Sequence, residues 1–280
     1  MATEIRVRSW TELNEQLFAE SWQEELGRFR SGYLFRGAPD AAYDLRTGLA
    51  RLTDDPAAVE GALLRNFRKY ARRDLVPDDS VWSWLAVAQH HGLPTRLVDW
   101  SYSPYVALHF VTESLGKYDR DGVVWCIDYG RTNALLPRVL AEILAEERSY
   151  AFTSEMLDRV ATTLPALDRL APEPFFLFIE PPSVDERIVN QFALFSLISS
   201  PSASLDDWLR AHPRLCRRLI VPAELKWEVR DRLDQLNVTE RVLFPGPDGL
   251  SAWLKRYYSP GNVRPGRVGA GPVTTAPGRY

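Results

Sequence analysis

The pattern of apolar and polar positions divides the chain into short helices and short strands. In the segment 56–73, Val59, Leu63, Phe67 and Tyr70 recur at helical spacing and predict an amphipathic helix. Similar spacing, with caps and prolines at the expected starts, predicts helices over about 10–29, 81–90, 134–148, 222–235 and 250–257. Apolar runs rich in β-branched and aromatic residues predict strands at 33–37, 122–128, 175–179, 193–199 and 217–221.

These elements do not alternate strand by helix, and the Gly-rich phosphate loop of a dinucleotide-binding unit is not found. The pattern is therefore typical of an α+β fold, and we expect a single domain. From residue 259 onward the chain is rich in Gly and Pro, has no acidic residue and has no periodicity. We expect the segment 258–280 to be a disordered basic tail.

Reactive and turn-forming residues are concentrated in the stretch 89–110, which reads QHHGLPTRLVDWSYSPYVALHF. The preceding helix should end at Gly92, where a left-handed C-terminal residue is expected, and Pro94 prevents its continuation. A second helix should begin near Pro104. The expected order is helix, loop, helix, and loops on rigid scaffolds carry many binding and catalytic groups.

Composition and charge exclude several classes of protein. The formal net charge is -3, which gives no global case for nucleic-acid binding. Cys126 and Cys216 lie far apart in strand-like segments, so we expect buried thiols rather than a disulfide or a zinc site. The chain starts polar and has no apolar run of membrane-spanning length, which predicts a cytoplasmic protein without membrane contact.

Several segments together resemble the FRG domain family, named after its Phe-Arg-Gly triplet. They are Phe35-Arg36-Gly37, then 89–100 (QHHGLPTRLVDW), then 187–191 (RIVNQ) and finally 243–250 (LFPGPDGL). The resemblance predicts an FRG domain over residues 1–257. The third segment departs from the family pattern, because Phe192-Ala193 stands where the family carries a glycine after the glutamine.

A second resemblance is to ADP-ribosyltransferases, whose NAD site is assembled from three separate segments. Arg36, then Asp99-Trp100-Ser101, then Gln191 occupy those places in order, and the resemblance implies a split β-sheet core with flanking helices. The family carries a catalytic glutamate at the third place. Here Glu186 would fill that place, or Asp99 would supply the negative charge, with Gln191 positioning the substrate.

The resemblance gives further residues a role in binding NAD, each beside a purely structural alternative. Arg36 would clamp the diphosphate or pair with Asp99, and Gly37 would let the backbone approach the ligand closely. Trp100 would stack on a ring or fill the core, and Asp99 would contact ribose or orient Arg36.

Three more polar residues of the stretch are candidates for contacts with the ligand. Ser101 would contact the ligand or cap the next helix, and Arg96 would contact the ligand or pair with Asp99 to hold the loop. His90 would donate to ribose or transfer a proton, or end its helix. His90 and His91 project about 100° apart on a helix, so a shared metal ion is disfavoured and no metal site is expected.

The function predicted from these resemblances is that of an ADP-ribosyltransferase or an NAD glycohydrolase, with NAD as substrate. Such enzymes often serve as toxins or in phage defence, and the acceptor would be a protein or a nucleic acid. Basic residues on one face of the helix 56–73 would admit a nucleic acid, although a solvated face is the more ordinary explanation for them. The alternative is a non-catalytic module that binds a nucleotide or a partner in the same cleft, and a nuclease using His90, His91 and Asp99 is a third, weaker hypothesis.

Overall fold

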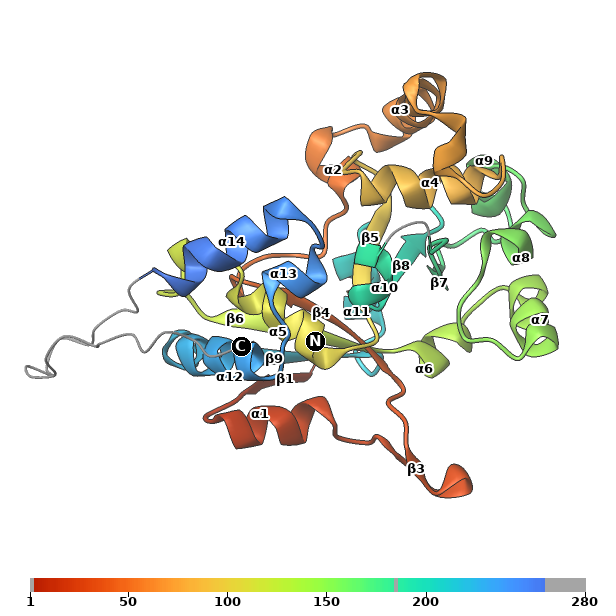
Figure 1. Cartoon of the computed structure of the whole chain (residues 1–280). Coiled ribbons are helices and arrows are strands. Elements are labelled where there is room, and N and C mark those ends of the chain that lie inside the picture. The colour runs from red at the N-terminus through yellow and green to blue at the C-terminus, as the bar shows by residue number, and fades with distance from the viewer. Residues whose placement is uncertain (1–2, 184–185, 260–280) are drawn as a thin grey trace, which may run out of the picture.

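The fold is built on a mixed β-sheet, which the computed structural model describes within residues 3–183 and 186–259. Within these ranges the sheet has seven strands (Figure 1). In sheet order they are β1 (Thr3–Arg6), β9 (Cys216–Val221), β6 (Gly122–Asp128), β4 (Tyr33–Ala38), β5 (Leu97–Ser101), β8 (Ala193–Ile198) and β7 (Phe176–Ile179). The pair β1–β9 is parallel and the other neighbouring pairs are antiparallel.

The sheet is split between β4 and β5. These strands share one registered residue pair, Phe35 with Ser101, whereas β4 pairs with β6 along its whole length and β5 likewise with β8. The halves β1-β9-β6-β4 and β5-β8-β7 therefore diverge at this point. The mixed helix and strand composition with flanking helices is as predicted.

Helices cover the outer faces of both halves. Their bounds are α1 (Trp10–Leu17), α2 (Gly48–Leu52), α3 (Pro56–Tyr70), α4 (Val81–His90), α5 (Pro104–Thr112), α6 (Tyr129–Asn133), α7 (Arg138–Glu147), α8 (Ser154–Asp158), α9 (Leu164–Asp168), α10 (Glu186–Asn190), α11 (Leu205–Ala211), α12 (Lys226–Gln235), α13 (Glu240–Leu243) and α14 (Pro247–Tyr257). Single 3₁₀ turns are η1 (Glu24–Leu26), η2 (Arg73–Leu75), η3 (Leu115–Lys117) and η4 (Ala223–Leu225). A two-stranded hairpin, β2 (Trp22–Gln23) and β3 (Arg28–Phe29), projects from the body in Figure 1.

Alternation along β6 explains why the first half of the sheet is buried on both faces. Val123, Trp125 and Ile127 face an inner core, which also receives Val98 and Trp100 from β5. Val124 and Cys126 face the opposite way, into a core formed with α1, α5 and α12. Successive side chains of a strand point to opposite faces, so a continuous apolar run predicts burial on both. A third core lies where α3, α4 and α7 to α9 cover β5, β8 and β7.

Two sequence predictions are wrong in this part of the chain. The helix predicted over 10–29 ends at Leu17, because the chain turns there and residues 22–29 form the hairpin around Gly27, which has φ +57°. The loop predicted after α4 is interrupted by strand β5 at 97–101, which pairs with β8 over five residues. Its apolar residues are separated by Asp99, and the turn-forming residues before it dominated the sequence pattern.

Several other predictions are confirmed. β6 has the predicted bounds, Gly92 has φ +81° directly after α4, and α5 begins at Pro104. The helix predicted over 134–148 begins at Arg138, since Pro137 is its N-cap. Both cysteines are buried free thiols. From residue 260 onward, the predicted tail lies outside the described residues. Among the residues that the structure describes, no helix is long and apolar enough to cross a bilayer.

Candidate functional site

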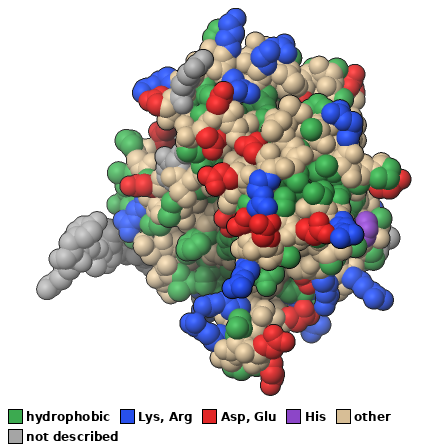
Figure 2. Space-filling view, turned by 90° about the vertical axis from the view of Figure 1, so that its right-hand side faces the viewer, with side chains coloured by type: hydrophobic (Ala, Val, Ile, Leu, Met, Phe, Trp, Pro, Cys, Tyr) green, Lys and Arg blue, Asp and Glu red, His purple; other side chains and the backbone are tan. Residues whose placement is uncertain are grey.

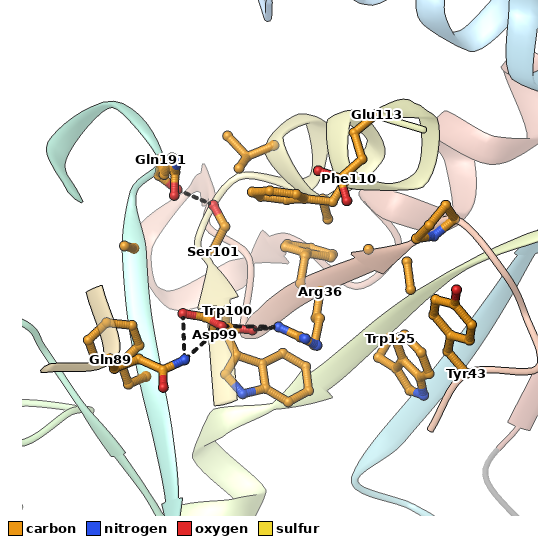
Figure 3. Close-up of a pocket in the computed structure, with 18 of the residues that line it drawn as sticks. Arg36, Tyr43, Gln89, Asp99, Trp100, Ser101, Phe110, Glu113, Trp125 and Gln191 are labelled. Carbon is orange, nitrogen blue, oxygen red and sulfur yellow. Dashed lines mark hydrogen bonds and ion pairs between the residues drawn. The ribbon is translucent and has the colours of Figure 1, made fainter. Parts of the chain in front are cut away.

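A cavity of about 910 Å³ opens where the two halves of the sheet diverge. Its walls come from β4 and β5, the C-terminal end of α4, one side of α5, and α10 (Figure 3). The residues of the Phe-Arg-Gly triplet and of the motif 89–100 therefore meet at one hollow, although about fifty residues of sequence separate them. The cavity lies where β4 and β5 separate, because these two strands share a single registered residue pair.

Arg36 lies on β4 and points into this cavity beside Asp99 (Figure 3). Its Nη1 donates a hydrogen bond of 2.7 Å to the backbone oxygen of Asp99 and lies 3.6 Å from that residue's Oδ2. Burial lowers the pKa of the Arg36 guanidinium, and the charge of Asp99 opposes this shift. The expected Arg36–Asp99 pair is present, and it leaves donor capacity of the guanidinium directed to the cavity.

Gln89, the last residue but one of α4, fixes the carboxylate of Asp99. Its Nε2 donates to both carboxylate oxygens, at 3.0 and 3.2 Å, and its Oε1 accepts from Thr95 Oγ1 at 2.6 Å. These bonds determine which way the Gln89 amide points. Sequence reasoning gave Gln89 no role, although its place at the start of the motif 89–100 was the available signal.

Gln191 and Ser101 meet at another wall of the cavity. Ser101 Oγ donates to the backbone oxygen of Gln191 at 2.7 Å, and it also accepts from the Ser103 N–H at 3.0 Å. The Gln191 side chain donates through Nε2 to the backbone oxygen of Leu243 at 2.9 Å, which ties it to α13. Both residues line the cavity, and both have structural bonds there.

Trp100 forms part of the inner core as well as of the cavity wall. Its side chain is buried and its Nε1 donates to Ser196 Oγ at 2.8 Å. A ring held in this way offers little surface for stacking. Tyr43 and Phe110 are the more accessible aromatic side chains of the lining.

Glu113 is a carboxylate of the cavity that sequence reasoning missed. It directly follows α5, and its side chain lies near Phe110 in Figure 3. It is an exposed residue that borders the cavity, and desolvation by the neighbouring protein raises its pKa to about 7, which the charge of Arg36 partly opposes. The sequence signal is a lone acid at the end of an apolar helix.

Arg187 on α10 is part of the motif 187–191, but no role was predicted for it from the sequence. It lines the cavity, its guanidinium lies 4.9 Å from the ring centroid of Phe244, and its buried Nε has no hydrogen-bond partner among the described residues. An arginine with unused donors at a cavity is suited to binding an anion.

A comparison with protein families matches part of the chain. Residues 31–120 match the FRG domain. Arg36, Gln89, Asp99 and Glu113 lie inside this FRG segment, whereas Gln191 lies outside it. No curated protein and no solved structure matches the chain.

Arg96 belongs to the FRG segment but does not line the cavity. Its guanidinium is buried between Glu60 and Asp168: Nε donates to Glu60 at 2.5 Å, Nη2 also contacts Glu60, and Nη1 donates to Asp168 at 2.6 Å. Burial would lower its pKa, but the bonds to the two carboxylates raise it. The expected pairing of Arg96 with Asp99 is therefore wrong, because Arg96 joins α3 and α9 instead.

Two other residues have a different setting from the expected one. Glu186 is exposed at the start of α10 and is not part of the cavity lining, so it is not placed to supply the third-segment carboxylate. Gly37 lines the cavity, but a Cβ there would lie 1.8 Å from the backbone oxygen of Ala107. Its small size thus allows α5 to pack closely on β4.

His90 and His91 both line the cavity, with their rings edge to face at 5.3 Å between centroids. Across the described residues, no group of three or more His, Cys, Asp or Glu side chains is arranged to hold a metal ion. The cavity lining instead contains three arginines, three carboxylates, two histidines and accessible aromatic rings.

Proposed function

We propose that the cavity binds NAD and that the protein cleaves the bond between nicotinamide and ribose. ADP-ribose then passes to a macromolecular acceptor or to water. The observation that carries this proposal is the meeting of Arg36 with Asp99-Trp100-Ser101 at the split of the sheet, with Gln191 on the adjoining wall. The resemblance to ADP-ribosyltransferases implies these residues in this order and arrangement. Our proposal that the fold is related to that of ADP-ribosyltransferases depends on this agreement.

The two incompletely paired arginines support binding of the diphosphate. A guanidinium presents several N–H donors in a plane and binds phosphate oxygens in a bidentate manner. Arg36 retains donors beyond its bond to Asp99, and Arg187 has a buried Nε without a partner among the described residues. The cavity volume of about 910 Å³ is at the large end of small-molecule sites, as an extended dinucleotide requires.

Asp99 supports the chemical step. Departure of nicotinamide leaves positive charge on the ribose ring, and a fixed carboxylate stabilises such an oxocarbenium-like state. Gln89 holds the Asp99 carboxylate through both oxygens, so its position is set before the substrate binds. Gln191, whose amide is tied to Leu243, would then shape the wall of the site.

The test is incubation of the purified protein with NAD and quantification of released nicotinamide by chromatography. Arg36→Met should lower kcat/KM at least about 100-fold, since removal of an anchoring charged group costs roughly 2–5 kcal/mol. Arg138→Met is the matched control, because this arginine lies outside the cavity and its side chain is 90% exposed. Equal activity of both variants, or no nicotinamide release by the wild type, would contradict the proposal.

The acceptor is to be identified in the same experiment with labelled NAD and added protein, DNA or RNA. Arg68 and Arg72, on and beside the basic face of α3, pair with Asp79 and Asp74, so this face is partly neutralised. On the side of the molecule shown in Figure 2, basic and acidic side chains are interspersed. Label on protein alone would exclude a nucleic-acid acceptor.

A second function, a non-catalytic module that binds a nucleotide, is favoured by the bond that ties the Gln191 amide to Leu243. Asp99→Asn separates the two. An enzyme should lose turnover and keep affinity for NAD, whereas a module binds NAD and releases no nicotinamide in either form. We extend the enzymatic proposal to a toxin or phage-defence role, which predicts growth arrest on expression of the wild type and none with Asp99→Asn.

A further inference from the structure

Glu113 lies at the cavity but is not used in the reaction as described so far. It follows the last residue of α5 and borders the same hollow as Arg36 and Phe110 (Figure 3). Among the described residues, its carboxylate has no hydrogen bond and no ion pair. A carboxylate that is open to a cavity and has no structural bond is available for chemistry.

The charged groups around Glu113 come from several elements. The charge of Arg36 on β4 lowers the pKa of Glu113, and the charge of Glu240 on α13 raises it. Lys117 of η3 and Arg187 of α10 also border the cavity. Lys117 lies 3.8 Å from Asp40, and Glu240 pairs with Arg256, so each of these two has a partner of its own.

We propose that Glu113 is the general base of the site, which takes the proton from the acceptor as the acceptor attacks the ribose. This inference rests on the proposed NAD cleavage. It adds a catalytic residue at a place where the resemblance to ADP-ribosyltransferases predicts none, since the expected carboxylate was to come from the third segment, near Gln191.

The step balances as follows. The bond between the nicotinamide nitrogen and ribose C1′ breaks, and its electron pair returns to the pyridinium ring, which leaves as neutral nicotinamide. The oxygen or nitrogen of the acceptor forms a new bond to C1′. The proton of that O–H or N–H group goes to the Glu113 carboxylate and is later released to solvent. A base with a pKa near the working pH is best suited to this transfer, and that of Glu113 is raised to about 7.

The other carboxylates and amides are less suited to this role. Asp99 receives two hydrogen bonds from Gln89 and lies beside Arg36, which together fix the position of its carboxylate. Gln191 is an amide and cannot accept a proton at neutral pH. Glu186 lies outside the cavity lining. Asp99 and Glu113 thus divide stabilisation of the cation and proton transfer between them, as paired carboxylates do in glycoside hydrolysis.

The experiment compares nicotinamide release by the wild type, Glu113→Gln and Glu113→Asp between pH 5 and 9. For the wild type we expect kcat to rise with pH through about 7, as Glu113 loses its proton. Glu113→Gln should lose about 10²- to 10⁴-fold in kcat and should lose the acidic limb of the profile, while its Kd for NAD stays within threefold. Glu113→Asp should keep the limb at reduced rate, and formate should restore part of the activity of Glu113→Ala. Glu155→Gln is the control, because Glu155 is exposed on α8 and does not line the cavity.

The outcomes distinguish this inference from the proposed function. If the wild type releases nicotinamide and Glu113→Gln retains both its rate and its acidic limb, Glu113 is not the base and the NAD proposal stands. The same holds if the rate falls but neither the limb changes nor formate restores activity, because Glu113 would then have a structural role. If the wild type releases no nicotinamide, both the proposed function and this inference fail.

Discussion

Arg36 and Arg96 both belong to the FRG segment, both lie at the sheet, and they differ in what surrounds them. The side chain of Arg96 is 1% exposed and is enclosed by two carboxylates, Glu60 and Asp168. That of Arg36 is 25% exposed at the cavity and donates a hydrogen bond to the backbone oxygen of Asp99. Burial opposes the charge of both, but the bonds raise the pKa of Arg96, whereas that of Arg36 remains lowered.

The difference teaches how to separate a structural arginine from a binding one. A buried charge whose donors are all used holds elements together, and here Arg96 joins α3 and α9 to the start of β5. A desolvated charge with unused donors at a cavity retains free energy that a ligand can recover. By this criterion Arg96 serves the fold, and Arg36 is the arginine that we propose binds the ligand.

The largest effect should come from Arg96→Met. It leaves the Glu60 carboxylate buried without a partner, so we expect the free energy of unfolding to fall by about 3–5 kcal/mol. Arg36→Met should change it by less than about 1 kcal/mol, because its partner Asp99 has a side chain that is 56% exposed. Urea unfolding of the two variants measures the difference, and equal destabilisation would remove the distinction between the two arginines.

The next effect concerns Gly37, beside Arg36. Gly37→Ala places a Cβ against the Ala107 carbonyl of α5, and we expect a loss of about 3 kcal/mol from the forced shift of the helix. Gly116→Ala is the control, since a Cβ there meets no atom within 4 Å. If Gly37→Ala were as stable as the wild type but bound NAD poorly, Gly37 would serve the ligand rather than the packing.

A smaller effect should appear as pH dependence of stability in Glu113→Gln. The pKa of Glu113 is raised above its value of 4.5 to about 7, so the folded state favours its protonated form. The stability that this protonation provides is complete below pH 4.5 and is lost as pH rises through 7. Relative to the wild type, Glu113→Gln should gain about 1 kcal/mol at pH 8 and nothing at pH 4.5, after allowance for screening by water in the cavity. Thermal unfolding at both pH values measures this, and a constant difference would contradict the raised pKa.

The smallest effect concerns Phe192, which follows Gln191 directly after α10. Phe192 has φ +46°, in the left-handed region that favours glycine, and its side chain is 60% exposed. Phe192→Gly should raise the free energy of unfolding by about 0.5–1 kcal/mol, because it relieves the backbone and removes little packing. Phe192→Ala keeps the strain and should gain nothing; an equal gain in both variants would show that the side chain itself is unfavourable.

The motifs could be predicted from the sequence better than the residues that contact them in the fold. The strand β6 and the meeting of Arg36 with Asp99 could be predicted, since each depends on a local pattern or on a recognised motif. The partners of Arg96 could not, because Glu60 and Asp168 lie 36 and 72 residues away and carry no shared pattern. Glu113 was missed for the same reason. It borders the cavity because α5 packs against β4 at Gly37, and no local sequence pattern indicates this packing. The hairpin at 22–29 was not predicted, because the helical spacing of apolar residues continues by chance as far as Trp22.

The most direct test of the ligand role of Arg36 is calorimetric titration of NAD into the wild type, Arg36→Met and Arg138→Met. We predict saturable binding of one NAD per chain to the wild type and to Arg138→Met, and at least about 100-fold weaker binding to a folded Arg36→Met. Binding of equal strength in all three, or no binding to the wild type, would contradict the assignment of Arg36 to the ligand.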